Sequence, residues 1–456
     1  MGFLVSLALG ACKLSRKVIR LTGGGATSFP GKLATKICPD ILAHLAKDVH
    51  TIIITGTNGK TTTSRMVEEM LKETGYDYFD NKSGANLQFG ITAAFAENST
   101  LSGRPKNKWA IIECDEAAFK QVGKFTDPDY VIVTNLFRDQ LDRFGEISTT
   151  LENIKIGVAN SPRAVLCLNA DCSMTASIAE GIDNKVLFFG VNEPIYKERV
   201  RESSDAPYCI HCKQEYTYEY ITYGHLGKYH CPGCGYSRPE PEVSVEKVLL
   251  SDENHSEIEL RVGGESRKAV ISLPGGYNIY NGVAAYCLAY AMNLDLATAV
   301  KALSCFECGF GRMEAFNLGE ASTRMILIKN PAGCNQVLNF LTNLREKSLF
   351  AICLNDKYAD GRDISWIWDV DFEILTRLED KLDRILVSGI RAYDMALRLK
   401  YAGIDSNKLI VEQDYNKLLD TIAGQEKPVY IMPTYTSMMD LRALAGKRFG
   451  LKNFWE

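Results

Sequence analysis

The distribution of apolar and polar positions along the chain predicts an α/β protein. Residues 50–55 form a short run rich in β-branched residues that is typical of a buried strand, and a glycine turn and a helical pattern over 61–74 follow it. Comparable strand runs recur at 109–114, 130–134, 164–168 and 186–189. Because these strands alternate with helical or loop segments, we expect a parallel sheet that is covered by helices.

A second α/β pattern starts near Met325, with strand runs near 325–328, 349–354, 384–388 and 429–432. A polar stretch over 193–242 interrupts the first pattern, and a turn with an apolar helix over 272–291 restores it. With 456 residues, the chain has room for several domains. We predict an N-terminal basic helical segment over 1–45, a central domain over 46–318 with an insertion over 193–242, and a C-terminal α/β domain over 319–456.

The composition narrows the class of protein. Hydrophobic residues make up 46% of the chain and charged residues 24%, which is the balance of a globular protein. A net charge of −4 argues against a dedicated nucleic-acid binder, which would carry a strongly basic face. No apolar run reaches the ~18 residues that a membrane-spanning helix needs. Most of the 14 cysteines are scattered, many of them in apolar runs, as expected for a protein of the reducing cytoplasm.

The N-terminal segment carries a regular charged pattern. Lys13, Arg16, Lys17 and Arg20 recur at helical spacing and would form a cationic stripe on one helix. Such a stripe is most often a solvated helix face. It also suits contact with a membrane surface or with an anionic substrate, and the sequence leaves these interpretations open.

The turn between the first strand and its helix has the residue types of a phosphate-binding loop. Glycines let backbone N–H groups surround phosphate oxygens, and the following helix adds the positive end of its dipole. Lys60 can reach the β- and γ-phosphates of a nucleotide, and the Thr61 hydroxyl can ligate Mg²⁺. Ile54 takes the place of the first glycine of the common pattern, so the loop is a shorter variant. The predicted nucleotide-binding residues are Gly56, Thr57, Asn58, Gly59, Lys60, Thr61 and Thr62.

The polar insertion contains two CxxC pairs, Cys209 with Cys212 and Cys231 with Cys234, separated by 18 residues. This is the spacing of a four-cysteine zinc ribbon. Four thiolates complete a tetrahedron, so we expect a structural Zn²⁺ site with no open position for catalysis. The alternatives are two disulfides or a redox pair, which fit poorly in a chain otherwise full of free cysteines.

The phosphate loop resembles that of the Mur ligase superfamily, the ATP-dependent ligases of peptidoglycan and folylpolyglutamate synthesis. The resemblance implies that Glu113, at the end of the strand over 109–114, binds Mg²⁺ and acts with Lys60 in catalysis. In the sequence YNIYN it assigns Asn278 to the adenine side of ATP, and in GRME it assigns Arg312 to the nucleotide phosphates. The implied fold is a Mur ligase-like central P-loop ATPase domain with a parallel-rich sheet and a zinc-ribbon insertion, followed by a Rossmann-like C-terminal domain.

Two further segments resemble family motifs with substitutions. Thr134–Asn135 and 139–142 correspond to the family's TN and DHLD segments, with Gln140 in place of the histidine. Asn330–Pro331 corresponds to the end of its DYAHNP motif, with Ile326 in place of the aspartate and Lys329 in place of the histidine. The second metal site and the ribose contact of the family are therefore not carried over to this chain.

The loop after the strand at 349–354 contains the sequence DGRDISWIWD. Acids, glycine and tryptophan at a strand end suit a functional loop, and they equally suit an Asx-rich turn packed by Trp366 and Trp368. Together with the cysteine insertion, this loop resembles the amidating branch of the superfamily, found in Gram-positive bacteria and their relatives. There a synthetase subunit converts the D-glutamate α-carboxylate of lipid II to D-isoglutamine through an acyl phosphate, with ammonia from a GatD-type glutaminase subunit.

This resemblance implies a partner. Glutamine hydrolysis needs a cysteine nucleophile with a histidine base, but three of the six histidines lie inside the cysteine segment and no cysteine outside it stands beside a histidine in the sequence. The chain therefore resembles one subunit of a heterodimer. By its position in the motif, Asp363 would orient the glutaminase histidine, with Asp360 and Asp356 as alternatives.

Two other functions stay open. A free-standing Mur-type ligase, such as a folylpolyglutamate synthase, would add an amino acid in place of ammonia. A zinc-ribbon scaffold would use an ATP site only to regulate assembly. For the amidating enzyme, we expect ATP, Mg²⁺ and Zn²⁺ as cofactors and a cytoplasmic protein whose lipid II substrate lies at the inner face of the membrane.

Overall fold

The computed structural model describes residues 2–21, 28–81, 85–139, 147–196, 205–306, 312–378 and 380–451. Its larger sheet contains β1 (His50–Thr55), β2 (Tyr78–Asp80), β3 (Trp109–Glu113), β4 (Tyr130–Val133), β5 (Val165–Asn169), β6 (Val186–Val191), β9 (Val243–Ser251), β10 (Ser256–Val262) and β11 (Glu265–Ile271). The strand order is β11-β10-β9-β6-β5-β4-β1-β3-β2. All pairs from β2 to β9 are parallel, and β9, β10 and β11 form an antiparallel meander at one edge. The predicted parallel-rich sheet is confirmed.

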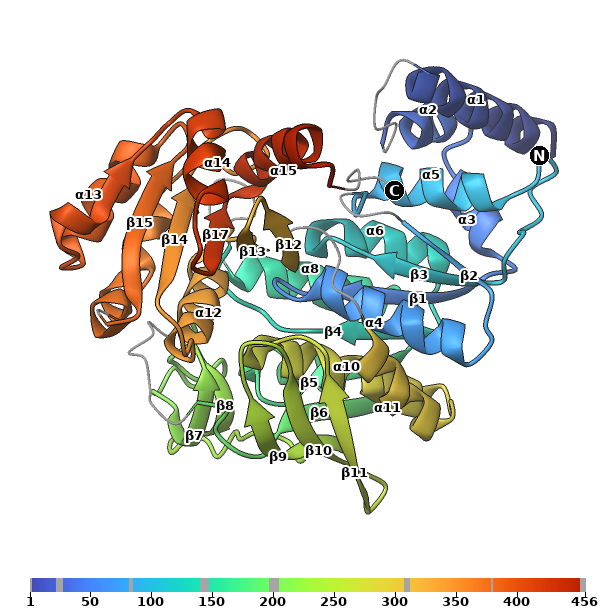
Figure 1. Cartoon of the computed structure of the whole chain (residues 1–456). Coiled ribbons are helices and arrows are strands. Elements are labelled where there is room, and N and C mark those ends of the chain that lie inside the picture. The colour runs from blue at the N-terminus through green and yellow to red at the C-terminus, as the bar shows by residue number, and fades with distance from the viewer. Residues whose placement is uncertain are drawn as a thin grey trace.

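Helices cover both faces of this sheet (Figure 1). One face carries α4 (Lys60–Glu73), α10 (Gly276–Ala291) and α11 (Leu296–Cys305). The other carries α6 (Glu116–Thr126) and α8 (Ile147–Ala159), while the short α9 (Ser173–Ala176) follows β5. The strands read as continuous apolar runs because both of their faces are buried.

The N-terminal segment contains three helices, α1 (Gly2–Leu21), α2 (Phe29–Ile37) and α3 (Ile41–Ala46). They pack against one another and against α5 (Gln88–Asn98), at the outer rim of the central domain (Figure 1). The interpretation of the basic stripe as a solvated face is wrong for two of its four members. Arg16 pairs with Glu97 on α5, and the Lys13 ammonium donates to the Ser99 carbonyl.

A second sheet forms the C-terminal domain, in the order β12-β13-β17-β14-β15-β16. Its strands are β12 (Arg312–Leu318), β13 (Ala321–Ile326), β14 (Ser348–Cys353), β15 (Leu382–Ser388), β16 (Leu409–Val411) and β17 (Val429–Pro433). Its helices are α12 (Pro331–Thr342), α13 (Ala392–Tyr401), α14 (Tyr415–Ala423) and α15 (Tyr435–Phe449). This domain also contains the short helical turns η2 (Ser365–Asp369), η3 (Phe372–Leu378) and η4 (Ser406–Lys408), whereas η1 (Ser177–Ala179) lies in the central domain. The sequence boundary at 318/319 is wrong by one strand, because β12 pairs antiparallel with β13 and so belongs to this sheet.

The two domains share apolar packing. One cluster of buried side chains runs from the central sheet through α12 to one face of the C-terminal sheet, while α14 and α15 cover the opposite face with a cluster of their own. Between the domains, Met313 has a left-handed φ of +64° at a bulge in β12. A non-glycine residue in this region is strained, so the surrounding structure must hold the backbone there.

Candidate nucleotide and four-cysteine sites

The loop between β1 and α4 closes tightly around its own backbone. Gly56 and Gly59 have left-handed φ values of +117° and +87°, and a Cβ atom at either position would collide with the side chain of Thr134 or Asn281. Thr134 donates to the Asn58 carbonyl at 2.7 Å, and the Asn135 amide accepts from the Asn58 N–H at 3.0 Å. The two glycines are therefore required by backbone conformation and by close packing.

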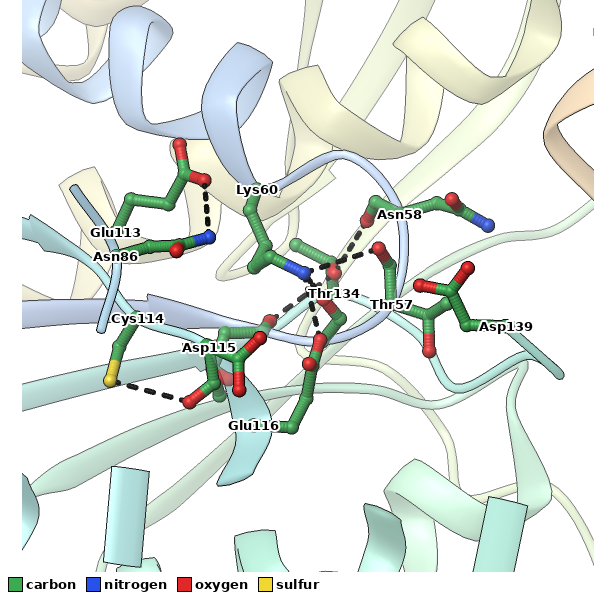
Figure 2. A network of polar contacts seen from close by, with 12 residues as sticks. Thr57, Asn58, Lys60, Asn86, Glu113, Cys114, Asp115, Glu116, Thr134 and Asp139 are labelled. Carbon is green, nitrogen blue, oxygen red and sulfur yellow. Dashed lines mark hydrogen bonds and ion pairs between the residues drawn. The ribbon is translucent and has the colours of Figure 1, made fainter. Parts of the chain in front are cut away.

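Lys60, the first residue of α4, points back into this loop (Figure 2). Its ammonium donates to the Gly56 carbonyl at 2.5 Å and to the Thr57 carbonyl at 3.2 Å, and it pairs with the Glu116 carboxylate at 2.8 Å. Burial lowers the pKa of Lys60, but the carboxylate of Glu116 outweighs that effect and raises the pKa above its ordinary value. The lysine therefore keeps its positive charge beside the cavity.

Thr61 and Glu113 come together from different elements. The Thr61 hydroxyl donates to a Glu113 carboxylate oxygen at 2.6 Å, and the other oxygen accepts from Asn86 at 3.4 Å. Asn81 fixes the backbone of Glu113 through bonds of 2.9 and 2.7 Å. A hydroxyl and a carboxylate side by side at a phosphate loop are the donor set that Mg²⁺ uses with nucleotides, so these residues fit that ion.

A cavity of about 1000 Å³ opens beside the loop and reaches the C-terminal domain. Six of the seven predicted loop residues line it, together with Asn278; the seventh, Gly56, packs against Thr134 and Asn135. Asn278 is buried near the start of α10, donates to the Pro274 carbonyl at 2.7 Å and accepts from Asn281 at 3.1 Å. From the C-terminal domain the lining includes Met313, Ile326, Lys329, Asn330, Tyr358 and Arg362. A cavity of this size between two α/β domains is large enough for a nucleotide and a second substrate.

Lys329 and Asn330 connect the two domains at the cavity. The Lys329 ammonium pairs with the Asp139 carboxylate at 2.6 Å. The Asn330 amide donates to the Asn58 side chain at 3.1 Å while its oxygen caps α12 through the Gly333 N–H at 2.8 Å. Lys329, at the position where the family has a histidine, thus pairs with Asp139, the first residue of the segment that corresponds to DHLD.

Several residues of the predicted motifs lie outside the described part of the chain, and one that is described has a structural contact. Gln140, Asp142, Gly311 and the side chain of Arg312 are outside the described residues. Glu314, the last residue of the GRME element, accepts from Arg442 of α15 at 2.9 Å, so it holds β12 against that helix.

The four predicted cysteines form one cluster. Their sulfur atoms all lie within 4.8 Å of one another. None of the cysteines in the described residues forms a disulfide. Burial raises the pKa of the Cys209 thiol, but backbone N–H groups of Cys212 and His211 outweigh it and bring the pKa down to about 6. Four converging cysteine sulfurs are the donor set of a structural zinc ion, so these residues fit that ion.

The cysteine insertion is anchored to the central domain by a buried ion pair. The hairpin of β7 (Thr217–Tyr223) and β8 (Leu226–His230) lies between the two CxxC pairs. After the second pair, Arg238 donates to Asp171 at 2.5 Å, and the other Asp171 oxygen accepts from Tyr280 of α10 at 2.5 Å and from the Val191 N–H at 2.9 Å. Thr222 of β7 also meets the Tyr280 hydroxyl at 2.7 Å. The insertion is therefore held against the helix that carries Asn278.

The fold brings together one cysteine–histidine pair that the sequence did not suggest. The Cys172 thiol lies 3.5 Å from the His225 ring, and both side chains are fully buried. Burial raises the pKa of the Cys172 thiol and lowers the pKa of His225 to about 4. Neither residue lines the cavity. A buried thiol held in its protonated form is a poor nucleophile, so this pair is a packing contact.

The C-terminal aspartates differ in exposure. Asp363 is exposed, and its carboxylate accepts from the Ser365 N–H at 2.8 Å, which lowers its pKa. Asp360 is buried and holds the start of α15 through the backbone and hydroxyl of Thr436. Asp356 pairs with Arg391 at 3.4 Å. Of the three, Asp363 is the one whose carboxylate is open to a partner, although its bond to Ser365 is also that of an Asx turn.

The sequence prediction missed two polar residues of the loop site. Glu116 and Asn86 were not predicted, yet one pairs with Lys60 and the other contacts Glu113. The signal for Glu116 was present in the sequence ECDE at the end of a predicted parallel strand, where side chains gather at the carboxyl edge of the sheet. No local pattern marks Asn86.

Comparisons with known proteins agree with this geometry. A model of the Mur ligase middle domain matches residues 54–232, and a model of the MurT ligase C-terminal domain matches residues 327–438. The chain is 33% identical over 450 residues to the lipid II isoglutaminyl synthase (glutamine-hydrolyzing) subunit MurT of Streptococcus pneumoniae, covering 98% of each chain. It is 34% identical over 443 residues to the subunit of the same name from Staphylococcus aureus, covering 97% of this chain and 98% of the relative.

The fold has solved relatives as well. MurF from Acinetobacter baumannii superposes with a TM-score of 0.67 at 17% identity, covering 91% of this chain and 80% of that one. The fold and the loop-centred cavity define a Mur-type ligase, and the resemblance to that superfamily is confirmed. Within this class, the chain belongs to the MurT family.

Proposed function

We propose that this protein is the synthetase subunit of an enzyme that amidates the α-carboxylate of D-glutamate in the stem peptide of lipid II, forming D-isoglutamine in peptidoglycan synthesis. The relatives in the pneumococcus and in S. aureus are named for this synthase and for glutamine hydrolysis. The observation that carries the proposal is the cavity in which Lys60 and the Thr61–Glu113 pair face a second α/β domain.

The reaction would proceed in two displacements. The substrate carboxylate attacks the γ-phosphorus of ATP, ADP leaves, and an acyl phosphate forms. Ammonia then attacks the acyl carbon, inorganic phosphate leaves, and the nitrogen loses a proton. Catalysis of this kind rests on positioning and on neutralising the transferring phosphoryl group, and Lys60 and Arg312 supply positive charge for that.

Other cavity residues have distinct roles in this scheme. Asn278 contacts the adenine side of ATP. The Thr61 hydroxyl and the Glu113 carboxylate would hold Mg²⁺, which would neutralise phosphate charge. The four cysteines would hold Zn²⁺, which would stabilise the insertion behind α10 without taking part in the chemistry.

The ammonia would come from a separate glutaminase of the GatD type. The pair of Cys172 and His225 is buried and away from the cavity, and the cysteines of the CxxC pairs converge on one another. Since glutamine hydrolysis needs a reactive thiolate and a base, this chain is poorly equipped for it. In the proposed complex Asp363 orients the histidine of the glutaminase, as the third member of a triad.

An apolar surface beside Asp363 supports the presence of such a partner. The helical turn η2, which begins two residues after Asp363, packs against α13. Just before α13 and along it, side chains that are 49–71% exposed form one stripe. Trp368 of η2 joins this stripe and packs edge-on against Tyr401. The stripe consists of Ile390, Tyr393, Leu397 and Tyr401. Exposed aromatic and aliphatic side chains gathered on one face are typical of protein interfaces.

The test is co-purification of the chain with a glutaminase subunit, followed by lipid II amidation with either glutamine or ammonium as nitrogen donor. With the complex, both donors should support amidation and ADP release. With the isolated chain, ammonium should support these reactions and glutamine should not. Release of ADP on addition of an amino acid, with no response to ammonium, would instead identify a free-standing amino acid ligase.

The role of Asp363 has its own prediction. Asp363→Asn should abolish glutamine-dependent amidation and leave ammonium-dependent amidation unchanged, because the substitution affects only the partner's histidine. Asp420→Asn, at an exposed aspartate of α14, is the matched control and should change neither rate. Loss of both activities in the Asp363 variant would show that this loop serves the synthetase site itself.

A further inference from the structure

The N-terminal helix α1 has two apolar faces, and only one of them is covered in the described part of the chain. Val5, Ala8, Leu9 and Cys12 are buried against the neighbouring helices. On the other face, apolar side chains between 49% and 80% exposed follow the whole length of the helix. They are Phe3, Leu4, Leu7, Leu14, Val18 and Leu21. This stripe is not part of the cavity or of the surface beside Asp363.

Most of the charges around this stripe are positive; the exception is Glu97 of α5, which pairs with Arg16 and lies 3.9 Å from Arg20. At about 3.6 residues per turn, Lys17 and Arg20 lie between the exposed and the buried apolar faces, and both are exposed. The neighbouring helix α2 adds exposed Lys32 and Lys36 beside an exposed Phe29. There is no acidic residue before Asp40, although the whole chain has a net charge of −4. Positive charge is thus concentrated next to the exposed apolar stripe.

We propose that α1 binds the surface of an anionic phospholipid bilayer, lying in the plane of the interface. The apolar stripe would enter the boundary between headgroups and acyl chains, and Lys17, Arg20, Lys32 and Lys36 would contact lipid phosphates. A helix with a covered apolar face, an open apolar face and a basic edge is suited to this position. None of the helices in the described ranges is long and apolar enough to cross a membrane.

The position of α1 agrees with such an attachment. It lies at the outer rim of the molecule (Figure 1), and α2 connects it to α5. The N-terminus of α5 begins beside Asn86 and Leu87, which line the cavity. The proposal of membrane binding depends only on the features of α1 and its neighbouring charges. Its benefit, which is to hold the cavity near a lipid-linked substrate, rests on the proposed function.

The test uses the full chain and co-sedimentation with vesicles. Vesicles of phosphatidylglycerol mixed with phosphatidylcholine should bind the protein, pure phosphatidylcholine should bind it less, and salt should weaken binding to the anionic vesicles. Leu7→Ser with Leu14→Ser should reduce binding at least about tenfold, because both leucines lose apolar contact with the acyl chains. Leu249→Ser with Leu250→Ser, at exposed leucines of β9, is the control and should bind normally.

A second variant tests whether the loss of vesicle binding is due to a folding defect. Lys17→Glu with Arg20→Glu should lose the preference for anionic vesicles while keeping the wild-type melting temperature. Equal sedimentation of wild type and both variants would overturn the proposal. So would a concentration-dependent dimer that Leu7→Ser with Leu14→Ser dissociates, in the absence of vesicle binding, since it would identify a second copy as the occupant.

Failure of this inference can be separated from failure of the proposed function. Amidation of a short-chain, detergent-soluble lipid II analogue should be the same for wild type and for the α1 variants. If vesicle binding is absent while this amidation proceeds, only the membrane proposal is overturned. If vesicle binding is present without amidation under any condition, only the proposed function is overturned.

Discussion

Two buried ion pairs in the central domain have similar chemistry and different settings. Lys60, which lines the cavity, meets Glu116 at 2.8 Å, and the two side chains retain 11% and 7% exposure. Arg238 and Asp171 meet at 2.5 Å beneath the cysteine insertion, with 3% and 0% exposure. Both pairs join segments that are far apart in the sequence.

The difference lies in what else each charge contacts. The Asp171 carboxylate also accepts from Tyr280 and the Val191 N–H, and Arg238 also donates to Asn192 at 3.0 Å. Apart from Glu116, the bonds of Lys60 go to carbonyls of its own loop. A phosphate could replace those bonds, whereas nothing but the native partners can satisfy Asp171. A buried ion pair of this kind is structural when all its partners are fixed and functional when one charge faces a cavity.

The largest effect should come from breaking the structural pair. Asp171→Ala leaves Arg238 buried without its counter-ion, so the free energy of unfolding should fall by about 3–5 kcal/mol. Urea denaturation followed by circular dichroism measures it. Glu219→Ala, at an exposed pair with Lys228 on the β7–β8 hairpin, should cost less than about 1 kcal/mol. Equal losses in the two variants would contradict the structural role.

Breaking the other pair should affect activity more than stability. Lys60→Met removes the charge that faces the phosphates, and the rate of ATP-dependent amidation should fall about 10²–10³-fold. The melting temperature is the control and should fall less than that of Asp171→Ala. Full amidation by the Lys60 variant with the glutaminase present would support the scaffold interpretation and exclude the mechanism proposed here.

Much of the fold follows from local sequence patterns. The parallel strands β1, β3, β4, β5 and β6 begin and end within two residues of prediction, because buried strands between helices give continuous apolar runs. The meander β9–β11 was missed although its signal is present. β10 alternates strictly between buried and half-buried residues, and Gly263–Gly264, both with positive φ, form a two-residue hairpin turn. The extra strand β12 was missed because its partner lies beyond the predicted domain boundary.

The residues of the candidate site also differ in whether the sequence could predict them. The loop residues and Glu113 lie in contiguous motifs, so the sequence could predict them as a group. The contacts of Lys329 with Asp139 and of Asn330 with Asn58 could not be predicted, because they join positions 190 and 272 residues apart through the docking of two domains. Asp171 and Arg238 also carry no motif, since each is needed only as the partner of the other.

Acid should lower the stability of the folded chain through a buried histidine of the insertion. His225 lies in the turn directly before β8, and burial lowers its pKa from 6.5 to about 4. Between these values the unfolded chain binds a proton that the folded chain does not, so stability falls as the pH drops, by about 2 kcal/mol at pH 5. His225→Leu should flatten the pH dependence of urea unfolding between pH 7 and 5. His44→Gln, at an exposed histidine, should leave it unchanged.

The smallest effect should come from the partner of Lys60. In Glu116→Gln, the amide keeps one acceptor for the Lys60 ammonium but removes the negative charge that holds its pKa above the ordinary value, so burial then lowers that pKa. At neutral pH the rate of amidation should fall about tenfold or less. The alkaline limb of the pH–rate profile should move to lower pH, because Lys60 loses its proton more easily. If Glu116 had only a structural role, Glu116→Gln would lower the melting temperature without moving that limb. The role of Glu116 would then be structural, like that of Asp171.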